Sequence, residues 1–352
     1  MSTRAADLPF VHARPILRVD GEARPALGEA ALAAQLRLPL AGMATCELRL
    51  LNWGTRSDTG EAGFQFEELR LGAELELSLG EQSQAPAFTG QVTGIEERYG
   101  DGAPQIVLLA EDALHRLARA RASRVFEDQS LDEVVRSLAD EAGLVTDVAV
   151  SSATASWHQH NESALAFLLR LTAPHDVAPR LQDGALRARD EAPDPEPVAL
   201  DPGRNVLRLR LLADLNRQPR RVAVTGHALA TGSNLEADSE ALSPAPDGTP
   251  AYRLLEDLGW EGDSTLPHPV PRSQAEADAL AERGLRRRAG RFLHGEVLCR
   301  GEPGLRSGRE IELSGVSERL AGRYRVVDCS HRFDAAEGFT TRIKITRSHW
   351  ND

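Results

Sequence analysis

The sequence has little of what most often carries chemistry or crosses membranes. Only three of its 352 residues are cysteine, and a single residue, Lys344, is lysine. No apolar run approaches the roughly 20 residues that a membrane-spanning helix needs. The first residues also lack the apolar core of a secretory signal. We therefore expect a protein made in the cytoplasm, without an integral membrane segment.

The three cysteines, Cys46, Cys299 and Cys329, lie far apart and mostly on strand-like segments. They are expected to be buried free thiols. A disulfide between Cys299 and Cys329 is conceivable because both belong to the C-terminal strands, but a reducing compartment argues against it. The net charge of −12 argues against direct recognition of nucleic acid.

Catalytic motifs are missing as well. The chain has neither the G-x-S-x-G elbow of a hydrolase nor the H-E-x-x-H motif of a zinc protease. Gly301, Gly304 and Gly308 are spaced like a phosphate loop, but a strand is expected after them, where phosphate binding needs a helix N-terminus. His331 is expected to be a packed, hydrogen-bonding side chain. We predict no catalytic, cofactor-binding or metal-binding residue and no cofactor.

One cluster of ligand-type residues is present, in the segment Trp157-His158-Gln159-His160-Asn161-Glu162. A His-x-His pair on a strand points both imidazoles to one face, and Glu162 could complete a metal site. The alternative interpretation is that the segment leads into a helix that begins at Asn161 as its cap.

Two strand-rich parts stand at the two ends of the chain, with alternating apolar residues and turn glycines. The first has expected strands at Pro15–Asp20, Ala34–Leu40, Thr45–Leu51, Glu74–Leu79, Phe88–Tyr99 and Gln105–Ala110. The second has expected strands at Val206–Leu212, Arg221–Gly226, Gly295–Arg300, Arg309–Gly315, Arg323–Ser330 and Gly338–Thr346. In the first part, short strands at this spacing indicate a closed or nearly closed barrel.

Helical periodicity is found between these parts. The capping box Ser130-Leu131-Asp132-Glu133 opens a helix that Gly143 should end, and a second helix follows from Asn161. Residues 120–190 should therefore form a compact mixed module. Residues 227–271 are rich in glycine, proline and acidic residues, so a long, partly mobile insertion is expected there. A helix from Ser273 to about Arg288 follows it.

Four segments, in order, resemble the phage late control gene D family. This family comprises the central baseplate hubs of contractile tails and is related to the N-terminal part of type VI secretion VgrG proteins. The resemblance spans about residues 120–347, although Ala164 replaces the usual acid in the second segment. The segments are Phe126–Val135 with Ala142-Gly143-Leu144, then Gln159–Leu171, then the alanine-rich helix with the Gly301–Gly308 approach, and finally the terminal strands to Arg347.

The resemblance implies an α+β fold that is mainly β. It implies two similar β-barrel tube domains, at residues 1–118 and at residues 193–226 with 291–352. A small α+β module at residues 119–192 would lie between them. Residues 227–290 would be an insertion in the second barrel, with a flexible loop and one helix.

The implied function is that of a structural baseplate hub, not an enzyme. A homotrimer would present six barrels and adapt a hexameric tail tube to a trimeric spike. The implied partners are a separate spike protein, because the chain stops at Asp352, and a tail tube or tube-initiator protein. Tape-measure and baseplate wedge proteins are further candidates. The hub would be made in the bacterial cytoplasm and assembled into a phage tail or an injection particle.

Two other functions stay open at this point. The first is a tail-associated cell-wall hydrolase or metalloenzyme that uses His158, His160 and Glu162. The second is a glycan-binding adaptor built on the capped helices at 125–172, which the 5% content of aromatic residues disfavours because sugars bind on aromatic platforms.

Overall fold

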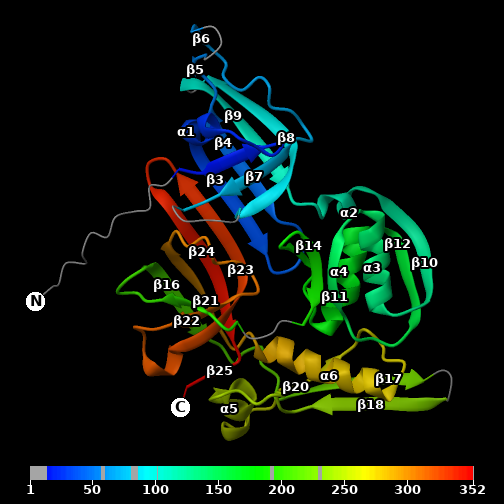
Figure 1. Cartoon of the computed structure of the whole chain (residues 1–352). Coiled ribbons are helices and arrows are strands. Elements are labelled where there is room, and N and C mark those ends of the chain that lie inside the picture. The colour runs from blue at the N-terminus through cyan, green and yellow to red at the C-terminus, as the bar shows by residue number, and fades with distance from the viewer. Residues whose placement is uncertain are drawn as a thin grey trace, which may run out of the picture.

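A computed structural model describes residues 14–56, 60–80, 86–100, 102–190, 194–228 and 232–351. Its main feature is a sheet of 13 strands, to which both ends of the chain contribute (Figure 1). In hydrogen-bonded order the strands are β16 (Val206–Ala213), β21 (Leu293–Arg300), β24 (Gly338–Arg347), β23 (Gly322–Asp334), β3 (Ala31–Pro39), β4 (Thr45–Leu51), β9 (Gly102–Glu111), β8 (Phe88–Gly100), β7 (Glu74–Ser78), β1 (Ile16–Val19) and β2 (Glu22–Ala23). Beside this path, β22 (Glu310–Leu313) pairs with β23, and β15 (Val198–Leu200) pairs with β22.

The two strand-rich parts are joined through β3 and β23. These strands pair antiparallel from Asp328 opposite Pro39 to Asp334 opposite Ala33. Over the described residues the strand order runs from β16 to β2 and does not return to its start. The closed barrels expected from the sequence are therefore not found: each part is an open, curled section of one sheet.

The two sections share one strand order. In the first section, β3, β4, β9 and β8 are neighbours, so the fourth strand along the chain lies between the second and the third. In the second section, β16, β21, β24 and β23 repeat that order. The hairpin strands also agree in length, since β8 and β23 have 13 residues each and β9 and β24 have 10 each.

Two irregularities in the ladders of each section coincide too. A register shift follows Val92 in the pairing of β8 with β9, and another follows Val326 in the pairing of β23 with β24. Each valine is the fifth residue of its strand. A second matched shift follows Ala31 in the first section and Val206 in the second. Because bulges re-aim a strand at a defined place, two matched pairs of bulges identify the sections as structural repeats.

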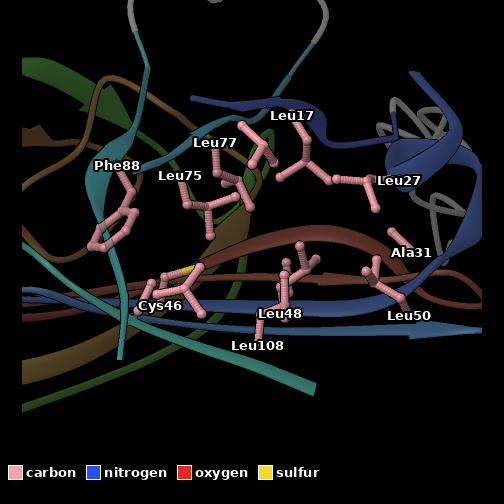
Figure 2. Close-up of a cluster of buried hydrophobic side chains, with 14 of the residues drawn as sticks. Leu17, Leu27, Ala31, Cys46, Leu48, Leu50, Leu75, Leu77, Phe88 and Leu108 are labelled. Atoms are coloured by element: carbon pink, nitrogen blue, oxygen red, sulfur yellow. The ribbon is translucent and has the colours of Figure 1, made fainter. Parts of the chain in front are cut away.

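Two hydrophobic cores lie under the sheet. In the first section the sheet curls over, and Leu17 and Leu77 point toward Leu48 and Leu108 on the facing strands (Figure 2). Phe333 and Phe339 enter this core from the second section. The second core has its own buried members, which include Leu200, Phe292, Val297, Ile311, Tyr324, Val326, Ile343 and Ile345.

A small α+β module forms a third core. Its helices are α2 (His115–Arg119), α3 (Leu131–Glu141), α4 (Ala164–Thr172) and the single turn η1 (Ala173–His175). Its strands are β10 (Arg121–Gln129), β12 (Ala155–Ser163), β11 (Val145–Ala149), β13 (Arg180–Gln182) and β14 (Ala185–Arg189). The predicted capping box is confirmed, because Ser130 and Glu133 bond to each other's backbone amides.

The segment after residue 220 is more ordered than its composition predicts. It contains β17 (Arg221–Ala228), β18 (Ser233–Ser239), α5 (Ala251–Asp257), β20 (Asp263–Leu266) and the predicted helix α6 (Gln274–Ala289). Leu235, Tyr252 and Leu255 are buried there, so apolar side chains dock the described part of 227–271. Strand β17, assigned from the sequence to the second barrel, instead pairs with β18 and β20 in a separate sheet under α6.

The remaining elements are short. Strand β19 (Thr249–Pro250) pairs with β25 (His349–Trp350), which fixes the end of the chain beside α5. The others are α1 (Pro25–Ala30), β5 (Gly54–Thr55), β6 (Ala62–Gly63) and η2 (Glu318–Leu320). None of the helices in the described ranges has the length and apolar content to cross a bilayer.

Candidate functional site: the open face and free edges of the sheet

The main sheet buries one face and leaves the other open. Along β3, Ala34 and Leu36 are buried whereas Gln35 and Arg37 are exposed, and the other central strands alternate in the same way. The open face contains two adjoining hollows of about 670 and 390 Å³. They share the lining residues Glu296, Leu298, Arg342 and Lys344.

This open face differs in charge from the rest of the chain. The whole chain carries a net charge of −12. Among the charged residues that line the two hollows, basic side chains outnumber acidic ones. They include the basic residues Arg37, Arg49, Arg208, Arg210, Arg332, Arg342 and Lys344 and the acidic residues Glu47, Glu296, Asp328 and Glu337. An acidic protein thus presents a polar sheet face with an excess of positive side chains.

Cross-strand ion pairs organise part of this face. Arg342 lies 2.7 Å from Glu296, and Lys344 lies 3.2 Å from Asp328. All four side chains are substantially exposed, so each pair adds only about 0–1 kcal/mol to the stability of the fold. These ion pairs therefore affect the charge pattern that the open face presents more than they affect the stability of the fold.

The sheet ends in two long free edges. Strand β16 pairs only with β21 among the described residues. Strand β8 pairs with β7 over its first residues, from Phe88 to Gln91, and from Gly94 onward it pairs only with β9 in the described chain. In the repeat, the matching part of β23 is covered by β3. An uncovered edge of this length is a template for another strand.

Exposed aromatic rings lie at the free end of β8. Tyr99 is 61% exposed, whereas Phe333, its counterpart in β23, is 2% exposed beside β3. Phe64 makes edge contacts with Tyr99 and with Trp53, whose ring centroid is 5.3 Å away. Because β3 covers Phe333 and no described strand covers Tyr99, the difference in exposure follows from the missing neighbour.

The predicted alternative site is located on β12. His158 and His160 are exposed on one face of this strand, as the His-x-His pattern indicates. Glu162, however, forms an ion pair with Arg170 on α4, with their atoms 2.5 Å apart, and this contact lowers the pKa of the Glu162 carboxyl. No group of three histidine, cysteine or acidic side chains suited to a metal occurs in the described ranges.

The helix after this strand starts later than predicted. Its cap is Ser163, whose hydroxyl accepts a hydrogen bond from the amide of Ala166. Asn161 is instead the extra residue of a bulge in β12, with φ of 45°. Asparagine tolerates this left-handed conformation. The expectation that Asn161 caps the helix was therefore wrong.

His331 and the cysteines belong to the core, as predicted. The Nε2 of His331 donates to the carbonyl of Leu305 at 2.9 Å, and the Nδ1 of His331 accepts from the hydroxyl of Thr341 at 3.0 Å. These bonds tie the loop that contains the glycines of 301–308 to the sheet. Cys46, Cys299 and Cys329 are free and buried, and burial raises the pKa of the Cys46 and Cys299 thiols to about 12.

The comparison with known families decides the identity. The sequence profile described as phage tail baseplate hub (GPD) matches residues 45–336. The chain belongs to the phage tail baseplate hub family. This hub is therefore a structural component of a tail or tail-like injection machine, which confirms the resemblance drawn from the four sequence segments. No match was found among curated protein sequences.

Solved structures show the same fold. The hub is similar to the 43 kDa tail protein of prophage MuSo2 from Shewanella oneidensis, with 14% identity, a TM-score of 0.71, and 95% of this chain and 98% of that one covered. A tail protein from Neisseria meningitidis MC58 matches with 12% identity and a TM-score of 0.67, over 95% and 96% of the two chains. The E. coli c3393 protein, a component of the type VI secretion system, matches with 12% identity and a TM-score of 0.58, over 90% and 73%.

Proposed function

We propose that this hub forms a homotrimeric ring that adapts a hexameric tail tube to a trimeric spike. The observation that supports it most is the structural repeat, in which one strand order and two matched pairs of bulges occur in both sections. Three chains then contribute six nearly equivalent sections. A ring of this kind offers sixfold order on one side and threefold order on the other.

The free edges suit such a ring. The order of strands places β16 at one end of the repeated array and β8 at the other. These two edges differ, so contacts between copies would be head to tail, and a head-to-tail contact closes when its rotation divides a full turn. Closure would leave neither strand as an exposed template.

The open face would line the central channel. Both hydrophobic cores lie on the other face of the sheet, so the polar face is the one that can border water. The basic side chains of the two hollows would then stand around the channel wall. A spike protein and a tail tube or tube-initiator protein would meet the two ends of the ring.

Sedimentation velocity tests the proposal. We expect the purified chain, at micromolar concentration, to sediment with three times the 38.2 kDa mass of one chain. A hub whose ring needs its neighbours should form, after addition of a spike protein, a complex that contains three copies of the chain and the added spike. A chain that stays monomeric alone and with its spike and tube proteins would contradict the proposal.

A further inference from the structure

Each section of the sheet has one strand edge that is unpaired in the described chain, although the matching edge in the other section is paired. Strand β23 is covered by β3 from Asp328 to Asp334, but the matching stretch of β8, Gly94–Gly100, has no second neighbour in the described chain. Strand β3 is covered by β23, but its counterpart β16 pairs only with β21 there. One missing neighbour is therefore a strand like β16, and the other is a strand like β8.

We propose that β8 of one copy pairs with β16 of the next copy, antiparallel and in the register in which β23 pairs with β3. The inference rests on the proposed ring and adds its strand register. The occupant of each free edge is thus a second copy of this chain.

The repeat supplies the register residue by residue. Counting along β8 and β23 from the bulges after Val92 and Val326 sets Tyr99 at the position of Phe333; the further shift between Arg98 and Gly100 in the pairing of β8 with β9 has no counterpart in β23. Counting from the bulges after Ala31 and Val206 sets Leu209 at the position of Ala34. The pairs expected between copies, given as the residue on one copy and the residue on its neighbour, are Gly94 with Asp214, Ile95 with Ala213, Glu96 with Leu212, Glu97 with Leu211, Arg98 with Arg210, Tyr99 with Leu209 and Gly100 with Arg208.

Exposure of the side chains agrees with this register. Tyr99 is 61% exposed although Phe333 at the same position is 2% exposed. Leu209 and Leu211 are only partly buried, although Ala34 and Leu36 at the same positions of β3 are buried. In the paired ring, the ring of Tyr99 would lie over Leu209 of the neighbour, and cross-strand pairs of this kind stabilise a sheet.

The charges at the junction are compatible with it as well. Arg98 would face Arg210 of the neighbour, which by itself is unfavourable. Glu96 already bonds to Arg98 at 2.8 Å and lies diagonally to Arg210 in the same register. One carboxylate would thus stand between two guanidinium groups, on the open face.

Engineered cysteines test the register. In the double variant Glu96→Cys, Leu212→Cys the two thiols would face each other across the junction, where Cα atoms are about 4.5–5.5 Å apart and a disulfide can form. Within one chain these positions are separated by seven strand spacings of about 4.8 Å each, so they cannot bond to each other. We expect dimers and trimers on a non-reducing gel after mild oxidation.

A slipped pair is the matched control. Arg98→Cys with Leu212→Cys keeps both thiols on the open face but sets them diagonally, about 7–8 Å apart and beyond disulfide reach. It should stay uncrosslinked, as should the natural chain, whose three cysteines are buried. Two results in a chain that sediments as a trimer would overturn the register but not the ring: a disulfide in the slipped pair, or no disulfide in either pair. A chain that is monomeric under all conditions would overturn both.

Hydrogen exchange of the natural chain checks the same point without substitutions. Amides of Gly94–Gly100 and Val206–Ala213 should gain protection when the protein concentration is raised from dissociating to associating conditions. Strand β11 in the α+β module, which has no part in the junction, should not change. Protection elsewhere on the sheet, with none at these two strands, would contradict the pairing.

A Tyr99→Ser variant should shift association to higher concentration, whereas Val145→Ser, at a residue 71% exposed on β11, should not.

Discussion

At the scale of single residues, two buried histidines link stability to pH. His331 is fully buried between Leu305 and Thr341. His175 is buried where the module meets α6, and its Nδ1 accepts a hydrogen bond from Arg283 at 2.9 Å. Burial lowers the pKa of each imidazole from 6.5 to about 4, and the nearby Arg283 guanidinium adds to the effect at His175.

The sign of the pH effect follows from these values. Between pH 6.5 and 4 the two histidines bind protons in the unfolded chain but stay neutral in the folded one. Their contribution to the free energy of unfolding is therefore fully present above pH 6.5 and falls as the pH drops to 4. Asp112 opposes this, because burial raises the pKa of its carboxyl to about 6. With two histidines against one aspartate, we expect a net loss of about 4 kcal/mol in the free energy of unfolding.

Urea unfolding at pH 7, 5.5 and 4 measures this loss. The His331→Gln variant should be less stable at pH 7 by about 1–3 kcal/mol, because the buried hydrogen bonds are disturbed. It should also lose part of the pH dependence. His158→Gln, at an exposed histidine, is the matched control and should leave the stability at pH 7 within about 0.5 kcal/mol of that of the natural chain. A His331→Gln profile parallel to that of the natural chain would show that His331 does not titrate as described.

At the scale of elements, the junction of β3 with β23 couples the two sections. Phe333 stands on β23 of the second section but is buried in the core of the first. We expect Phe333→Ala to lower the free energy of unfolding by about 3–5 kcal/mol, since a large buried side chain is removed. Phe64→Ala, at a partly exposed ring, is the matched control and should cost clearly less.

Urea unfolding combined with hydrogen exchange checks this coupling. In Phe333→Ala, the amides of β3 should lose protection along with those of β23, because the two strands share one ladder. A loss confined to β23, with β3 unchanged, would mean that the sections fold as separate units.

Elements that depend on local signals were predictable from the sequence. The capping box at Ser130 predicts the start of α3 because both of its bonds lie within one turn. Alternation predicts the strands at Thr45–Leu51 and Gly338–Thr346 because side chains on a strand repeat every two residues, and the structure extends the second by one residue to Arg347.

Partners distant in the sequence were not predictable in this way. Alternation gives a strand its two faces but does not name its neighbour, so the pairing of β3 with β23, almost 300 residues apart, left no trace in the local pattern. The same limit applies to β17, which reads as a strand but joins β18 and β20. The composition of 227–271 did not predict its strands β18 and β20, because a few buried side chains among polar ones are enough to dock a segment.

The candidate site shows the same division. A polar open face and free edges are properties of the assembled sheet, so no local motif marks them. The His158 and His160 pattern was visible in the sequence, and its geometry on one face of β12 was as expected. The ion pair of Glu162 with Arg170 depends on the packing of α4 against β12, which spacing alone does not fix.

At the scale of the whole molecule, the hub is a repeat built into one chain. Its two sections share one strand order, the lengths of the hairpin strands and two bulge positions, yet the residues they carry on the open face differ. A ring of three such chains would have approximate sixfold symmetry in its backbone. Because the side chains of the two sections differ, its exact symmetry would be threefold.

Averaged electron-microscopy images of the purified hub test this central claim most directly. Viewed along the axis, we predict a closed particle with a central hole, six similar lobes around it and exact symmetry of order three. A twofold dimer, an open filament or a lone subunit with both sheet edges bare would contradict it.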